Sequence, residues 1–145
     1  MAKRILVPIE DSGDAILPLT ASLARGAGAT VRLLRVVPIP RALEDSYLRV
    51  IASADQVMER LRATAASELA AAAATLEGIP VETVVRFGEP GVEAAVEAEV
   101  FDADLVLVST SRTALGAFFA PRPGDAVARR ASTPVLALRT RGGRR

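Results

Sequence analysis

Short apolar runs alternate along this chain with longer stretches in which apolar residues recur at helical spacing. The apolar runs predict strands over 5–9, 31–37, 81–87, 105–108 and 134–138. The helical spacing predicts helices over 14–27, 50–77, 92–100 and 124–131. Strand and helix thus alternate from one end of the chain to the other, which is typical of α/β proteins.

Turn-forming residues mark several of these boundaries. We expect Ser12 or Asp11 to cap the first helix, and Gly26 and Gly28 to act as its stop signals. The long second helix should end at Gly78, and the Glu89-Pro90-Gly91 segment should open the third helix.

The alternation predicts a single doubly wound, Rossmann-like α/β domain. Its five-stranded parallel sheet should have the strand order 3-2-1-4-5, with helices on both faces and right-handed crossovers. In such sheets ligands lie beyond the carboxyl ends of the strands, where the winding direction reverses. The residues that follow each strand are therefore the candidates for a functional site. The pair Asp102 and Asp104 precedes a strand, so it should lie at the opposite edge and serve structure.

Composition narrows the classes of function. With 145 residues the chain is long enough for one domain, which we place over residues 1–145. It contains no Cys and no His, which excludes disulfides, thiolate nucleophiles and imidazole bases, and no metal site is expected. The formal net charge is +1, so we expect neither nucleic acid nor a membrane as a partner. Residues 140–145 form a basic, frayed tail, and the absence of a signal segment predicts a cytoplasmic protein.

Several segments, taken in order, resemble the universal stress protein (UspA) family over nearly the whole chain. They are Ile5–Ser12, Leu33–Pro38, Gly88–Pro90, Ala103–Val108 and Thr133–Arg139. The resemblance implies that family's fold, which is similar to that of the adenine nucleotide alpha hydrolases.

The same resemblance implies a test for ATP binding. ATP-binding members carry a G-x2-G-x9-G-[S/T] loop after the fourth strand, because a Cβ there would hold backbone N–H groups away from the phosphates. This chain has Ser109, Arg112, Arg122 and Pro123 at the corresponding positions. We therefore expect the phosphate loop to be degenerate, with no cofactor required and ATP or AMP remaining an option.

The adenosine half of that site is better preserved. By the resemblance, Pro8 matches an apolar contact, Glu10 stands where the family has a ribose-binding Asp, and Val36 matches a contact to adenine. Glu10 is nevertheless more typical of a solvated carboxylate at a strand end. Arg112 and Arg122 are likewise more typical of solvated loop side chains. The full candidate set for a nucleotide or other ligand is Pro8, Glu10, Ser12, Val36, Ser109, Thr110, Arg112, Arg122 and Gly124.

The last strand should lie at an edge of the sheet, where an apolar strand can pair with another chain. In the family that this chain resembles, the last strands of two subunits pair. The expected homodimer residues are Pro134, Val135, Leu136 and Leu138.

Two functions from different classes follow. The first is a universal-stress-type protein that is not an enzyme and acts by binding and assembly as a homodimer, with a further protein partner left open. The second is a nucleotide-binding stress protein whose phosphate loop is rebuilt with Arg112 and Arg122. Weak ATP hydrolysis is left open, although no P-loop Lys or His supports it. A response-regulator receiver is disfavoured, because Arg86-Phe87-Gly88 stands where the third strand should end in an Asp.

Overall fold

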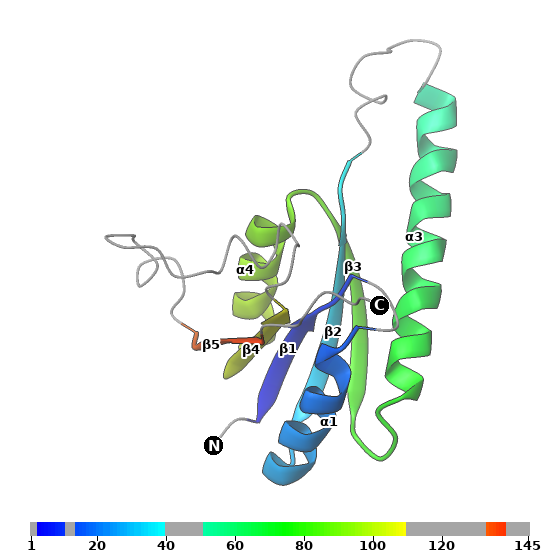
Figure 1. Cartoon of the computed structure of the whole chain (residues 1–145). Coiled ribbons are helices and arrows are strands. Elements are labelled where there is room, and N and C mark those ends of the chain that lie inside the picture. Colours follow the sequence, from blue (N-terminus) through cyan, green and yellow to red (C-terminus); the bar gives the residue numbers. More distant parts are fainter. Residues whose placement is uncertain (1–2, 11–13, 40–50, 110–132, 139–145) are drawn as a thin grey trace, which may run out of the picture.

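Strands and helices alternate in the computed structural model as the sequence pattern predicts (Figure 1). The structure describes residues 3–10, 14–39, 51–109 and 133–138. Its elements are β1 (Arg4–Pro8), α1 (Ile16–Ala27), β2 (Thr30–Val37), α3 (Ile51–Ala74), β3 (Val81–Phe87), α4 (Pro90–Phe101), β4 (Leu105–Ser109) and β5 (Val135–Leu138). The helix expected over 124–131 and the basic tail at 140–145 lie outside the described residues.

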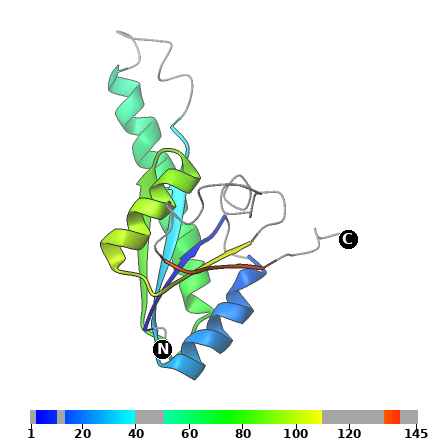
Figure 2. The same cartoon turned by 90° about the vertical axis from the view of Figure 1, so that its left-hand side faces the viewer.

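The five strands form one parallel sheet in the order β3-β2-β1-β4-β5, which confirms the predicted topology. α1 and α3 cover one face and α4 the other (Figures 1 and 2). The winding direction therefore reverses between β1, which pairs with β2, and β4, which pairs with β1 on its other side. In the part of the chain that the structure describes, no helix is both long and apolar enough to span a membrane.

Each face of the sheet has its own apolar core, because successive side chains of a strand point to opposite faces. Ile5 and Val7 of β1 pack with Leu69 of α3 on one face, while Leu6 packs with Phe101 of α4 on the other. Ile5, Leu6 and Val7 are all fully buried, as expected for a central strand covered on both sides.

The boundaries of α1 correct one prediction and confirm another. The residue at the cap is Ala15, which makes no side-chain bond, and it is Asp14 that accepts a 2.9 Å hydrogen bond from the Ile16 N–H. The prediction that Ser12 or Asp11 caps the helix was therefore wrong; both lie outside the described residues. Asp14 takes this role because it stands two residues before Ile16, close enough to bond the Ile16 N–H. The helix ends as predicted at Gly28, which adopts the left-handed conformation that favours glycine.

Candidate functional site

The carboxyl edge of the sheet brings the predicted nucleoside-binding residues of β1 and β2 to one place. Pro8 is buried and stands opposite Leu34. Just beyond β1, the Ile9 N–H donates a 2.9 Å hydrogen bond to the Leu34 carbonyl, so the two segments stay side by side there. This register brings Glu10 and Val36 to the same end of neighbouring strands. Glu10 is exposed, and no ion pair to its carboxylate occurs among the described residues.

The fourth strand reaches the same edge beside β1. Ser109 is its last residue and is half-buried. Three adjacent strands, β2, β1 and β4, thus bring Pro8, Glu10, Val36 and Ser109 to their carboxyl ends. The winding reverses at this point, which is where doubly wound proteins bind ligands. The other ligand candidates lie outside the described residues; they are Ser12, Thr110, Arg112, Arg122 and Gly124.

A tight turn leads from this edge into α4. The Gly88 N–H donates a 3.0 Å bond to the carbonyl of Val37, and Gly88 has a φ of 144°, in the region that side chains rarely adopt. A Cβ at Gly88 would lie 2.9 Å from Oε2 of Glu93. The turn therefore depends on a glycine both for its backbone conformation and for the space that the Glu93 side chain fills.

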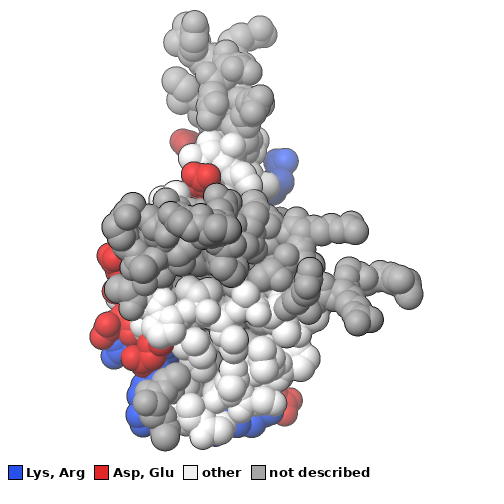
Figure 3. Space-filling view, turned by 60° about the vertical axis from the view of Figure 1, so that its left-hand side comes forward, with Lys and Arg blue, Asp and Glu red and all other residues white. Residues whose placement is uncertain are grey.

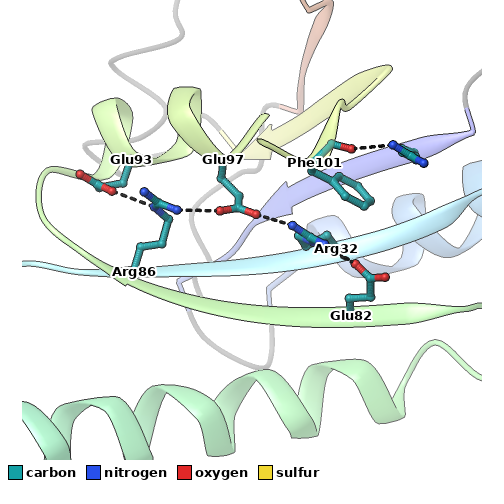
Figure 4. A network of polar contacts seen from close by, with 7 residues as sticks. Arg32, Glu82, Arg86, Glu93, Glu97 and Phe101 are labelled. Carbon is teal, nitrogen blue, oxygen red and sulfur yellow. Dashed lines mark hydrogen bonds and ion pairs between the residues drawn. The ribbon is translucent and has the colours of Figure 1, made fainter. Parts of the chain in front are cut away.

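A chain of charged side chains lies between α4 and the neighbouring strands β2 and β3 (Figure 4). Arg86 bonds Glu93 at 2.8 Å and Glu97 at 2.9 Å, while Arg32 bonds Glu97 and Glu82, each at 2.6 Å. Glu97 is at the centre, only 2% exposed, with one arginine on each carboxylate oxygen. These bonds hold the helix to the sheet and, through Glu93, to the Gly88 turn.

The carboxylates keep both guanidinium groups charged. The hydrogen bond to Glu93 is the largest influence on Arg86 and raises its pKa. Burial alone would lower the pKa of Arg32, but its bonds to Glu82 and Glu97 outweigh that effect and raise it. Arg32 also lies over the Phe101 ring, with its guanidinium carbon 4.3 Å from the ring centroid.

Sequence reasoning missed this network. Its signal was present, because Glu93 and Glu97 are four residues apart on a helix, and Arg32 and Glu82 carry opposite charges in strands predicted to pair. The register that places Arg32 directly opposite Glu82 could not be read from the sequence.

The acidic pair before β4 has the structural role that the sequence predicted. The Asp104 carboxylate accepts 2.9 Å hydrogen bonds from the backbone N–H groups of Lys3 and Arg4, at the amino end of β1. These two bonds hold the pKa of Asp104 below its usual value. Asp102 caps the carboxyl end of α4 in the left-handed conformation, and its Oδ2 atom lies 3.8 Å from Nη1 of Arg4. Within the described ranges, no three acidic side chains gather in a way that could hold a metal ion.

The predicted dimer residues lie where expected on the sheet. β5 is the outermost strand beside β4, and none of the described strands lies beyond it. Leu136 is 43% exposed, Pro134 is exposed, and Val135 and Leu138 are half-buried. An apolar side chain therefore reaches the surface at a sheet edge that can accept another strand.

Comparison with known proteins agrees with this architecture. Three solved structures share it over almost all of both chains. They are the universal stress protein UspA from Lactobacillus plantarum (18% identity, 94% of this chain and 97% of that one, TM-score 0.71), an Arabidopsis thaliana universal stress family protein with AMP bound (18%, 97% and 93%, 0.64) and the Archaeoglobus fulgidus universal stress protein in complex with dAMP (18%, 93% and 96%, 0.61). A search of curated proteins finds no match. The sequence model of the universal stress protein family matches residues 1–139, and the chain therefore belongs to that family.

Proposed function

We propose that this protein is a stress-response or regulatory binding protein that works as a homodimer, without catalysis and without the usual ATP loop. The observation that carries the proposal is the sequence that follows β4. Ser109, Arg112 and Arg122 stand where three glycines would expose their amides, and Pro123 has no N–H to offer a phosphate.

The chemistry of the chain supports a binding role over an enzymatic one. It contains no His or Cys, so the commonest general base and the thiolate nucleophile are both lacking. No P-loop Lys is present to stabilise charge on a transferred phosphoryl group. Protein association is supported by the apolar edge of β5, where Leu136 is exposed.

A second candidate function is favoured by the end of β1. Pro8, Glu10 and Val36 share the carboxyl edge at which the winding reverses. The related Arabidopsis thaliana and Archaeoglobus fulgidus structures hold AMP and dAMP, each with one phosphate group. A nucleoside monophosphate needs fewer phosphate contacts than ATP, and the guanidinium forks of Arg112 and Arg122 could supply them.

The two candidates are separated by a binding experiment on the purified protein. The protein is denatured and assayed for released adenine nucleotide, and the native protein is then titrated calorimetrically with ATP and Mg²⁺ and with AMP. Under the first function no nucleotide is released and neither titration gives binding heat. Binding of AMP that is lost in Arg112→Ala supports the second function.

The matched control for this experiment is Arg25→Ala. Arg25 is exposed in the last turn of α1, which runs opposite to the strands, so it lies at the amino edge of the sheet. Its removal takes away the same charge far from the candidate site and should leave any AMP binding unchanged. Tight ATP binding that survives Arg112→Ala and Arg122→Ala would contradict both candidates.

A further inference from the structure

α4 carries apolar side chains on the face that is turned away from the sheet. The inner face packs into the core through Ala94, Ala98 and Phe101. The outer face carries a valine stripe, which consists of Val92, Val96 and Val100 with exposures of 44%, 39% and 66%. The three valines are four residues apart, so they form one continuous row about 12 Å long.

Acidic side chains flank this valine stripe. Glu93 and Glu99 lie three residues before and after Val96 and are thus its neighbours on the helix surface. Glu89 is exposed at the amino end of α4, and α4 itself contains no Lys or Arg. Glu93 is paired with Arg86, whereas Glu89 and Glu99 take part in no ion pair among the described residues.

The basic side chains that the structure describes around α4 do not cancel this acidic character. The nearest arginines beneath α4, Arg32 and Arg86, are each already bonded to two carboxylates. At the carboxyl end of the helix, Arg4 lies 3.8 Å from Asp102. In Figure 3 acidic (red) and basic (blue) side chains lie together along the left border of the described surface, beside a broad uncharged area.

We propose that the valine stripe is a docking surface for a basic amphipathic helix of another protein. A partner helix with apolar anchors at positions i, i+3 or i+4, and i+7 would match the length of the stripe. Lys or Arg residues beside those anchors would meet Glu89 and Glu99, since Glu93 is already paired with Arg86. Such a partner covers the valines and at the same time pairs Glu89 and Glu99, which form no ion pair with any described residue.

The same charges argue against two other occupants. A second copy of this chain would bring its own Glu89 and Glu99 to the interface, and its α4 has no basic residue to pair with them. The headgroups of an anionic membrane would be repelled by the carboxylates, whereas membrane-surface helices carry basic residues on their polar faces. Charge complementarity therefore selects a basic partner.

This inference rests on the proposed function only in that both assign the protein a binding role. It adds the kind of partner that is bound. The proposed homodimer uses β5, at one edge of the sheet, whereas the valine stripe lies on the outer face of α4. Nucleotide binding does not enter the argument. Failure of one proposal therefore leaves the other testable, since Leu136 reports on the dimer edge and Val96 reports on the stripe.

The test uses a synthetic peptide helix of about 14 residues, long enough for four turns. Leucines follow one face and lysines fill the other positions, and a fluorescent label allows Kd to be measured by anisotropy. We expect a micromolar Kd, and we expect shifts of the α4 backbone amide signals in NMR spectra. Val96→Ser should raise Kd about tenfold, as should Glu99→Lys, because each removes one part of the complementary surface.

Three controls keep the result specific. Pro18→Ser removes an exposed apolar side chain from α1, on the opposite face of the sheet from α4, and should leave Kd unchanged. A peptide with glutamate in place of lysine should bind at least about tenfold more weakly. Far-UV circular dichroism verifies that Val96→Ser is folded, and Val100→Ser, at the most exposed valine, provides a second variant.

Several outcomes would overturn the proposal. They are absence of binding by the lysine peptide, equal binding to wild type and to both Val96→Ser and Val100→Ser, and equal binding of the acidic peptide. A wild-type oligomer that dissociates in Val96→Ser but not in Leu136→Ser would also overturn it, because a second copy would then cover the stripe.

Discussion

Arg32 of β2 donates a 2.6 Å hydrogen bond to Glu97, a carboxylate of α4 that is only 2% exposed. The other oxygen of Glu97 accepts from Arg86, so one buried acid joins two strands to the helix. Removing the acid leaves two partly buried cations that have each lost a partner. Leaving a charge without its partner is more costly than losing an exposed pair.

We predict that Glu97→Ala lowers the free energy of unfolding by about 3 kcal/mol, because it breaks a buried ion pair at its shared member. Urea denaturation followed by circular dichroism measures the change. Glu82→Ala is the matched control: Glu82 also bonds Arg32, but its side chain is 50% exposed, so its loss should cost less than about 1 kcal/mol. Equal losses in the two variants would show that the burial of Glu97 is not what matters.

Substitution of two glycines by alanine should have opposite effects. Gly88→Ala should destabilise the protein by about 1–3 kcal/mol, because φ is 144° and the new Cβ would meet Glu93 at 2.9 Å. Gly26→Ala should stabilise it by about 0.5–1 kcal/mol, because Gly26 lies within α1 and nothing occupies the space within 4 Å of its Cβ position. Thermal unfolding compares the two variants with wild type. A stabilising Gly88→Ala would contradict the turn geometry.

Asp104 should make stability depend on pH in the acid range. Its pKa is lowered in the folded protein by the N–H groups of Lys3 and Arg4, so its contribution is complete above the unfolded pKa of about 4. That contribution is lost as the pH falls through the folded pKa. The difference in urea midpoint between wild type and Asp104→Asn should therefore be constant near neutral pH and shrink below about pH 4.

The control for this pH series is Asp102→Asn. The Asp102 side chain is 91% exposed, and Asn tolerates the left-handed conformation found there. Its urea midpoint should follow that of wild type at every pH. A pH-independent difference for Asp104→Asn would mean that the carboxylate charge has no part in holding β1.

The dimer is tested at the edge of the sheet. We predict a dimeric mass for the wild-type protein in light scattering at micromolar concentration and a monomeric mass for Leu136→Lys, because a charge on an edge strand opposes pairing with another chain. Ile39→Lys is a suitable control, since Ile39 is similarly exposed at 49% and lies beyond β2, away from β5. A monomeric wild-type protein would rule out the dimer.

Strand order could be predicted because the alternation of strands and helices favours a doubly wound sheet, in which the continuously apolar runs of β1 and β4 suit the centre. Ile5, Leu6 and Val7 are buried on both faces of the sheet, and such a run has few alternatives in a chain of alternating elements. The residue that caps α1 could not be predicted, because the side chains of Asp11, Ser12 and Asp14 can all accept a hydrogen bond from a helix N–H. The choice depends on the residue at which the helix begins, and the structure shows that Asp14 bonds the Ile16 N–H.

The candidate site could be predicted only in part. Glu10 and Val36 could be assigned to one edge of the sheet because each stands at the carboxyl end of a predicted strand. The parallel topology alone brings those ends together. The contacts of Arg32 and Arg86 depend on strand register and on how α4 crosses the sheet, and neither has a local sequence signal. The valine stripe was visible as a spacing of four residues, but only the structure shows that it faces outward.

The bond between Asp104 and the amide of Arg4 also bears on how the chain is made, because the two residues are 100 positions apart. At a synthesis rate of about 5–20 residues per second, the ribosome needs about 5–20 s to reach the acid after β1 has been made. During that interval β1 can pair with β2 while its other edge waits for β4. One edge of β1 in the nascent chain therefore keeps its backbone hydrogen-bonding groups unpaired for several seconds. A chaperone would shield the chain mainly during this period.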